Sequence, residues 1–218
     1  MMLSRAEFEN KLNSNALKIA FIGMSNSGKS HFSKYLVEKE SFERCDIDGE
    51  VGARLDVGDV HDLAKWMGMP YDSQFPSHQA LYLEQEEIIT LEGLNRESYR
   101  NLIVDTTGSI CHLSDLVQKK LTEDFLVIYL QLPPEKISDM IDFYFEHPKP
   151  VIFGSHFSIQ RGEDNVSAVR SSYPKLLAAR QKVYESLSDV IIPAFDPNGV
   201  YTSSEDFWSY LLDSLYSN

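Results

Sequence analysis

The sequence predicts an α/β three-layer sandwich built on a five-stranded parallel sheet. Five short apolar runs are separated by segments with helical periodicity, which is the pattern of alternating strands and helices. Runs of this length are typical of parallel strands that are buried on both faces. The chain has 218 residues, of which 43% are hydrophobic and 24% charged, and it contains no internal repeat. These values suit a single domain spanning 1–218.

The elements follow one another along the chain in a regular order. The five strands are expected at 17–22, about 42–45, 102–104, 125–130 and 190–192. Helical periodicity covers 28–38, 77–94, 134–145, 165–187 and 205–215, and a further helix is expected around 3–12. In sheets of this kind, ligands bind beyond the carboxyl ends of the strands. Candidate functional residues are therefore those that directly follow a strand.

A glycine-rich loop follows the first strand and has the pattern G-x-x-x-x-G-K-S. Its glycines let the backbone N–H groups point at phosphate oxygens, and the helix that begins near Gly28 adds the positive end of its dipole. Lys29 is expected to bridge the terminal phosphates of ATP, and the Ser30 hydroxyl to coordinate Mg²⁺. The alternative is a glycine turn between a strand and a helix that binds nothing. The predicted nucleotide-binding residues are Gly23, Ser25, Asn26, Ser27, Gly28, Lys29, Ser30 and His31.

Carboxylates follow the second and third strands. Asp105 closes the third apolar run, which is the Walker B form whose aspartate serves Mg²⁺. Asp46 and Asp48 come after the second run and can take separate roles. One can hold Mg²⁺ through water, and the other can accept the proton of an attacking hydroxyl. We therefore expect Ser30, Asp46 and Asp105 at the metal and Asp48 in catalysis. The alternatives are an acidic turn at 46–48 and a turn cap at Asp105.

A basic stretch in the second half of the chain predicts a lid. Residues 146–182 hold six basic and three acidic side chains, although the whole protein carries a net charge of −13. The prolines and glycines of its first half indicate a mobile lid over about 146–164, whose cations Lys149 and Arg161 would stabilise the transferring phosphoryl group. Thr106, Thr107 and Gly108 are expected to bind the substrate, and an acceptor-binding insert is expected at about 50–95.

The layout resembles shikimate kinase and its relatives among the P-loop kinases of small metabolites and nucleoside monophosphates. The resemblance extends from about residue 17 to 192. It depends on the glycine-rich loop, on Asp46-Ile47-Asp48, on Val127-Ile128-Tyr129-Leu130 with Pro133-Pro134-Glu135, and on Arg180-Gln181-Lys182-Val183-Tyr184. It implies that Asp48 faces the acceptor, that Arg180 grips the acceptor, and that Lys149 takes the place of an arginine in the lid.

Two departures from the family pattern concern the acceptor. The family's Phe-Arg-x-x-Glu stretch has its best counterpart in Tyr82-Leu83-Glu84-Gln85-Glu86, where leucine stands in place of arginine. The family's triple glycine is replaced by Asp105-Thr106-Thr107-Gly108-Ser109. Losing one arginine removes a charge-assisted pair with a carboxylate, worth roughly 1.5–3 kcal/mol. We therefore expect poor activity on shikimate itself.

The function predicted from these features is an ATP-dependent kinase that transfers the γ-phosphoryl group to a hydroxyl of a small metabolite. A nucleoside or nucleotide kinase and a nucleotide-binding regulatory protein without phosphotransfer are the alternatives. The negative net charge argues against nucleic acid as a partner. The apolar runs are too short to span a membrane, and no signal peptide or disulfide framework is evident. We expect a cytoplasmic monomer or small homo-oligomer that uses ATP and Mg²⁺.

Overall fold

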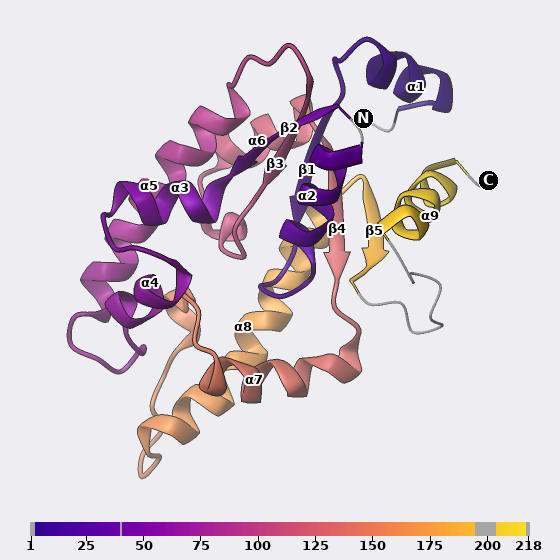
Figure 1. The fold of residues 1–218 in the computed structure, drawn as a ribbon. Helices are drawn as coiled ribbons and strands as arrows, with labels where there is room; N and C mark the ends of the chain where they lie inside the picture. The colour runs from indigo at the N-terminus through magenta and orange to yellow at the C-terminus, as the bar shows by residue number, and fades with distance from the viewer. Residues whose placement is uncertain (1–2, 40, 195–203, 217–218) are drawn as a thin grey trace.

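The structure, a computed structural model, describes residues 3–39, 41–194 and 204–216 (Figure 1). Its centre is a parallel five-stranded sheet with the strand order β2-β3-β1-β4-β5. The strands are β1 Lys18–Ile22, β2 Phe42–Asp46, β3 Asn101–Asp105, β4 Leu126–Gln131 and β5 Val190–Pro193. Each strand overlaps one of the apolar runs, and the predicted α/β class is confirmed.

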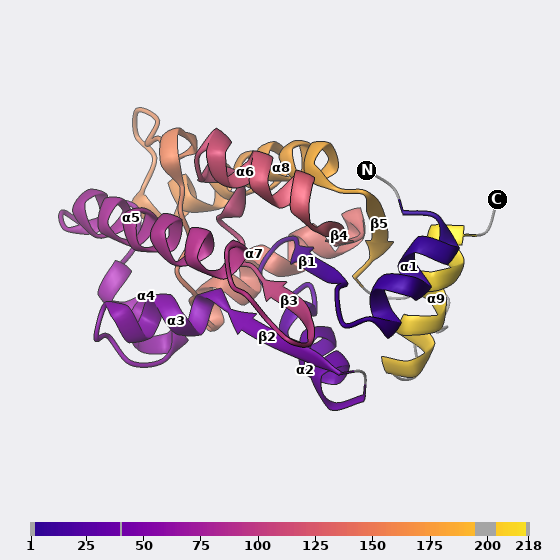
Figure 2. The ribbon, with the colours of Figure 1, turned by 90° about the horizontal axis from the view of Figure 1, so that it is seen from above.

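Helices cover both faces of the sheet and complete the three layers. They are α1 Arg5–Asn13, α2 Lys29–Lys39, α3 Ile47–Arg54, α4 Val60–Met67, α5 Phe75–Leu94, α6 Asp115–Asp124, α7 Ile137–Glu146, α8 Asn165–Leu187 and α9 Ser204–Tyr216. Short 3₁₀ turns lie at Ile110–His112, Pro134–Lys136 and Gly154–His156. Figure 2 shows α5, α6 and α8 on one side of the sheet and α2 on the other. Helix α9 lies beside α2, where the Phe207 and Phe32 rings stack at 3.6 Å, and α1 packs on α9.

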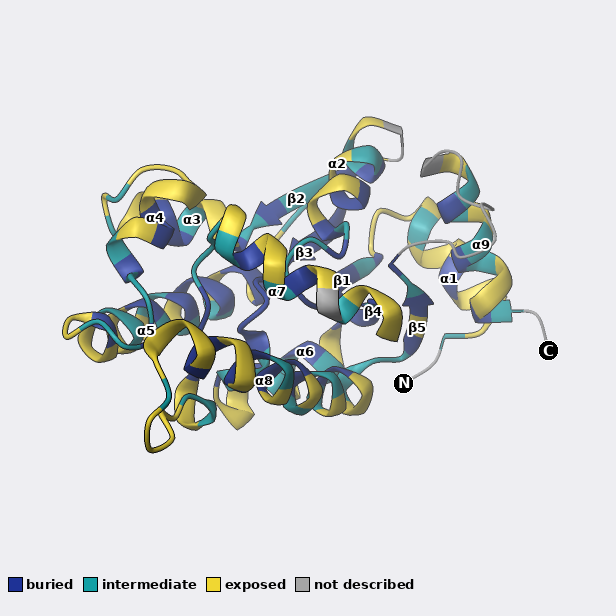
Figure 3. Cartoon of the chain, turned by 90° about the horizontal axis from the view of Figure 1, so that it is seen from below, coloured by how far each residue is buried: buried dark blue, intermediate teal, exposed yellow. Residues whose placement is uncertain are grey.

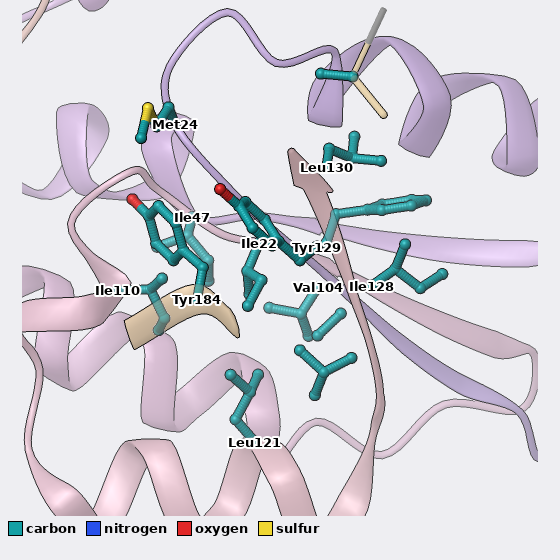
Figure 4. Close-up of a cluster of buried hydrophobic side chains, with 14 of the residues drawn as sticks. Ile22, Met24, Ile47, Val104, Ile110, Leu121, Ile128, Tyr129, Leu130 and Tyr184 are labelled. Carbon is teal, nitrogen blue, oxygen red and sulfur yellow. The ribbon is translucent and has the colours of Figure 1, made fainter. Parts of the chain in front are cut away.

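The core lies between the sheet and these helices. All five residues of β3 are buried, as are five of the six in β4. Figure 3 shows that the inward faces of the helices are buried and the outward faces exposed, while the edge strands β2 and β5 are only partly buried. On one face of the sheet, Leu121 of α6 and Tyr184 of α8 join strand residues such as Ile22 in one apolar cluster (Figure 4). Burying this much apolar surface is the main favourable contribution to folding.

The strand order brings the predicted functional loops to one edge. Strand β3 lies between β1 and β2, with Phe21 and Asp46 both in register with Asp105. The glycine-rich loop after β1 and the segments after β2 and β3 therefore leave the sheet side by side, as expected for ligand binding at the carboxyl ends of parallel strands.

Three helices, α3, α4 and α6, lie outside the predicted elements. Helix α3 follows its N-cap residue Asp46, whose carboxylate accepts a hydrogen bond from the Gly49 N–H, and glycines within the helix obscure its helical pattern. Helix α6 is capped by Ser114 and buries only Val117 and Leu121, so its apolar periodicity is faint. Among the helices in the described ranges, none has the length and apolar character needed to cross a membrane.

Candidate active site

A cavity of about 310 Å³ opens at the carboxyl edge of the sheet, beside the glycine-rich loop. Its walls come from the loop, from α3, α4 and α5, from the turn after β3, from the segment after α7, and from α8. The lining residues are Ser25, Asn26, Gly28, Lys29, Ser30, His31, Asp48, Val60, Tyr82, Gly108, Ser109, Lys149, Pro150 and Arg180.

The glycine-rich loop has the tight geometry that its sequence predicts. Gly23 has φ of 142°, and a Cβ there would lie 2.7 Å from the Leu130 carbonyl oxygen, so no larger residue fits. Asn26 also adopts a left-handed conformation, with φ of 63°. The loop wraps around Lys29, whose ammonium donates to the carbonyls of Gly23 and Met24 at 2.9 Å each. Burial lowers the pKa of Lys29, and the nearby Asp105 and Asp48 charges raise it.

The loop residues fit a bound phosphate. Ser30 is exposed in the first turn of α2, where backbone N–H groups lack helical partners and attract anions. The Ser27 hydroxyl is buried and has no hydrogen-bond partner in the described part of the chain. Gly23 and Ser27 are buried within the loop and do not line the cavity, whereas Ser25, Asn26 and His31 line it.

The carboxylates predicted to bind the metal, Asp46 and Asp105, lie next to one another and are bridged by an arginine. Asp105 is buried and Asp46 is partly exposed, and Arg44 of β2 forms ion pairs with both, at 2.5 Å and 2.8 Å. Arg44 and Ser33 both contact Asp105 at its Oδ2 atom. Hard oxygen donors of this kind, with Ser30 beside them, fit Mg²⁺. Within the described part of the chain, no three or more His, Cys, Asp or Glu side chains are grouped so that they could hold a metal ion.

Asp48 projects from the first turn of α3 toward the cavity. The Tyr82 hydroxyl donates to its Oδ1 at 3.4 Å. Although the residue exposes surface to the cavity, the surrounding protein atoms exclude much of the water and raise the pKa of Asp48 to about 6. Lys29 opposes this shift, and the carboxylates of Asp105 and Asp46 add to it.

A buried carboxylate lies behind the turn that follows β3. Glu86 of α5 accepts hydrogen bonds from the hydroxyls of Thr107 and Ser109, the latter at 2.6 Å. Burial raises the pKa of Glu86 to about 7, and these two hydroxyl groups counteract part of the shift. The Thr106 hydroxyl bonds to the Phe21 carbonyl at 2.8 Å. The two threonines that were predicted to bind substrate therefore hold the turn in place and do not line the cavity, whereas Ser109 lines it.

Helix α8 supplies a buried cation to the same wall. Arg180 is 5% exposed, and its Nη2 donates to the Ile152 carbonyl at 2.8 Å. Its Nε is buried without a hydrogen-bond partner among the described residues. Tyr184, one turn later, donates to the Gly108 carbonyl at 2.5 Å. A Cβ at Gly108 would lie 3.4 Å from Arg180 Nη1 and 3.3 Å from the Ser25 nitrogen, so the turn fits closely between loop and arginine.

The predicted lid segment divides into two parts. Lys149 reaches the glycine-rich loop and donates to Asn26 Oδ1 at 2.6 Å, and the next residues, 151–153, are buried. The backbone N–H groups of Phe153 and Gly154 donate to Gln79 Oε1. Arg161 lies in an exposed turn and is absent from the cavity wall. Of the two predicted lid cations, Lys149 is therefore at the cavity.

Buried charge is concentrated around this cavity. In the described ranges, the charged residues that are almost fully buried are Lys29, Glu86, Asp105 and Arg180. Lys29 and Arg180 line the cavity, and the two acidic residues lie directly behind its wall. Burying charge is unfavourable unless the group is paired or serves a ligand, so such residues mark functional sites.

Three solved structures share the fold over most of their length. The shikimate kinase of Acinetobacter baumannii, solved in complex with shikimate, is 14% identical with a TM-score of 0.59, and the match covers 92% of this chain and 94% of that one. The enzyme from Bacteroides thetaiotaomicron is 16% identical with a TM-score of 0.58, covering 89% and 98%. The enzyme from Aquifex aeolicus is 17% identical with a TM-score of 0.55, covering 91% and 96%.

The fold is shikimate kinase-like. The chain therefore has a P-loop fold of the kinase type, as the sequence predicted. No protein-family model matches the sequence, and no curated protein matches it. At this level of identity the shikimate kinase-like fold is what the similarity establishes.

Several residues at the site were not predicted from the sequence, among them Arg44, Val60 and Glu86. Arg44 lies in a strand, where no motif distinguishes it from an ordinary surface arginine. Val60 enters the wall through the start of α4, which had no predicted boundary. Glu86 had a usable signal, because it falls on the buried face of α5 that Tyr82 and Ile89 also occupy.

Proposed function

We propose that the protein is an ATP-dependent kinase that transfers the γ-phosphoryl group of ATP to a hydroxyl of a small metabolite. The observation that carries the proposal is the single cavity shared by the phosphate loop with Lys29, the carboxylate of Asp48 and the buried guanidinium of Arg180. The kinase-type fold supports the same assignment.

The residues of the phosphate loop take the nucleotide in this proposal. The backbone amides at the start of α2 and the Lys29 ammonium bind the phosphates, the ammonium leaving its carbonyl partners to do so. Ser30, Asp46 and Asp105 would hold Mg²⁺. The metal ion, when bound, neutralises charge on the phosphates. Lys149 already contacts the loop and is placed to cover the transferring group.

The residues on the opposite wall take the acceptor. Asp48 orients or deprotonates the attacking hydroxyl, and positioning of this kind is the main task in phosphoryl transfer. Arg180 suits an acceptor with a negative group such as a carboxylate, since its Nε has no hydrogen-bond partner among the described residues and its Nη1 approaches the cavity wall at Gly108. Residues 146–164 act as the lid that excludes water and prevents hydrolysis of ATP.

Shikimate is a poor acceptor in this proposal. Leu83 stands where the family has an arginine, and the described residues that line the cavity supply only three Lys or Arg side chains, at 29, 149 and 180. Two of these lie by the phosphate loop, which leaves one for the acceptor. Losing one arginine–carboxylate pair costs roughly 1.5–3 kcal/mol, or about a tenfold to hundredfold loss of affinity.

The test is ADP release from Mg·ATP by the full-length protein, with and without a pooled library of hydroxylated metabolites. We expect the library to stimulate release in the wild type and the Asp48→Ala variant to lose this stimulation. Asp115→Ala is the matched control, because Asp115 also lies in the first turn of a helix, α6, and does not line the cavity. The control should respond to the library as the wild type does.

Two results would overturn the proposal. One is ATP binding with no response to any acceptor pool, which would indicate a nucleotide-binding regulatory protein. The other is stimulation that persists unchanged in Asp48→Ala. Efficient turnover of shikimate alone would refute the assignment of the acceptor but leave the kinase activity intact.

A further inference from the structure

Arg44 lies between the two carboxylates of the proposed metal side. Its Nη1 bonds to Asp46 Oδ2 at 2.8 Å and its Nη2 to Asp105 Oδ2 at 2.5 Å. Its Nε contacts the Ser33 hydroxyl at 2.8 Å and Asp105 Oδ2 at 3.2 Å. The arginine side chain is 15% exposed and that of Asp105 is 2% exposed, so water screens this pair little.

The sheet and helix α2 build this arrangement. Arg44 and Asp46 are two residues apart on β2 and point to the same face, and Asp46 is in register with Asp105 on β3. Ser33 of α2 covers the guanidinium and also donates to Asp105 at 3.0 Å. Because the planar guanidinium is held by three different residues, its position is fixed.

The contacts occupy three of the four oxygens of these two carboxylates. Asp46 uses Oδ2 for Arg44 and Oδ1 to cap the Gly49 N–H. Asp105 uses Oδ2 for Arg44 and Ser33. The positive charge of the arginine also cancels half of the charge of these two carboxylates. A divalent cation that arrives alone therefore meets a weak site, whereas phosphates bring charge and further ligands to it.

We propose that Arg44 is a built-in counter-ion of the metal side, which keeps the carboxylates from binding a free divalent cation and makes metal binding depend on nucleotide phosphates. Arg44 is thus a positioning residue that acts through Asp46 and Asp105. The inference builds on the proposed nucleotide site, but it predicts a property of the protein without nucleotide.

The experiment measures binding of Mn²⁺, as a spectroscopic substitute for Mg²⁺, by electron paramagnetic resonance on full-length protein without nucleotide. We expect Arg44→Met to bind Mn²⁺ at least about tenfold more tightly than the wild type, since an opposing charge-assisted contact is removed. Mg²⁺ should also raise the melting temperature of this variant and leave that of the wild type nearly unchanged. The reason is that only in the variant does the buried Asp105 carboxylate lose its ion-pair partner. Arg54→Met is the matched control, since Arg54 pairs with Glu92 on the surface.

Equal Mn²⁺ affinity in wild type and Arg44→Met would overturn the proposal, whatever the kinase assay shows. Arg44→Gln keeps a hydrogen-bond donor without the charge and carries the same expectation if the methionine variant does not fold. Adding Asp105→Asn to Arg44→Met should return Mn²⁺ affinity to the wild-type level, and a gain that survives would also contradict the idea. A gain of Mn²⁺ binding in a protein that proves unable to bind ATP would remove the proposed function but leave the counter-ion role.

Discussion

The carboxyl group of Glu86 is fully buried, and its protonation should set part of the pH dependence of folding stability. It receives hydrogen bonds from the hydroxyls of Thr107 and Ser109, and its side chain has no exposed surface. Burial raises its pKa to about 7, against 4.5 without the protein environment. Replacement by glutamine keeps the shape and the polar contacts but removes the titration.

The sign follows from the direction of this shift. Between the two pKa values the folded protein holds a proton that the unfolded chain has released, so stability falls as the pH rises through this interval. The loss contributed by Glu86 is complete once the pH exceeds about 7. The difference between the two pKa values corresponds to roughly 3 kcal/mol in the free energy of unfolding.

The assay is urea unfolding of wild type and Glu86→Gln at about pH 5 and about pH 8. We expect the stability of the wild type relative to the variant to fall by roughly 2.5 kcal/mol between these conditions, since a small part of the effect is already lost at about pH 5. Ser109→Ala is an informative companion, because it removes a hydrogen bond that favours the ionised form of Glu86. The stability of this variant should therefore continue to fall to a higher pH than that of the wild type. A wild-type to Glu86→Gln difference that stays constant within about 0.5 kcal/mol would refute the reasoning.

Two further substitutions test the packing that supports the site. In Gly93→Ala the new Cβ would lie 2.7 Å from Cys45 Sγ, so we expect overpacking between α5 and β2 to cost about 1–3 kcal/mol of unfolding free energy in urea. An unchanged free energy of unfolding would show that α5 and β2 separate easily to make room for the methyl group. Tyr184→Phe removes the 2.5 Å hydrogen bond to the buried Gly108 carbonyl and should cost about 1–3 kcal/mol, measured in the same way. A variant as stable as the wild type would mean that the carbonyl finds another partner.

The sheet could be predicted because its strands carry their own signal. Buried parallel strands are short apolar runs whatever their neighbours are, and the glycine-rich loop marks the first strand independently. Helix α3 could not be predicted in this way. It is only eight residues long, contains Gly49 and Gly52, and is stabilised by a cap from Asp46 and by packing on α5. Tertiary contacts of this kind leave no periodic pattern in the sequence.

The partners of the charged residues were also beyond sequence reasoning. The loop after each strand indicated where Asp46, Asp48 and Asp105 would gather, since the carboxyl ends of parallel strands share one edge. Whether each carboxylate meets a cation depends on side chains that cross between strands, and Arg44 reaches Asp105 from the neighbouring strand. In the same way, Arg161 has the charge expected of a lid cation, but the chain places it in an exposed turn.

The partners of the buried charges argue for a ligand at the cavity. Four charged residues are buried, namely Lys29, Glu86, Asp105 and Arg180, and within the described residues Asp105 is the one that forms an ion pair, with Arg44. Lys29 and Arg180 donate to backbone carbonyls, and Glu86 accepts from hydroxyl groups. Neutral partners compensate a buried charge only in part, so three such groups reduce the stability of the protein without a ligand. A fold shaped only for stability would have paired these groups or replaced them with apolar side chains. The neutral partners of Lys29 and Arg180, which both line the cavity, therefore support the proposal that Lys29 binds phosphates and Arg180 binds the acceptor.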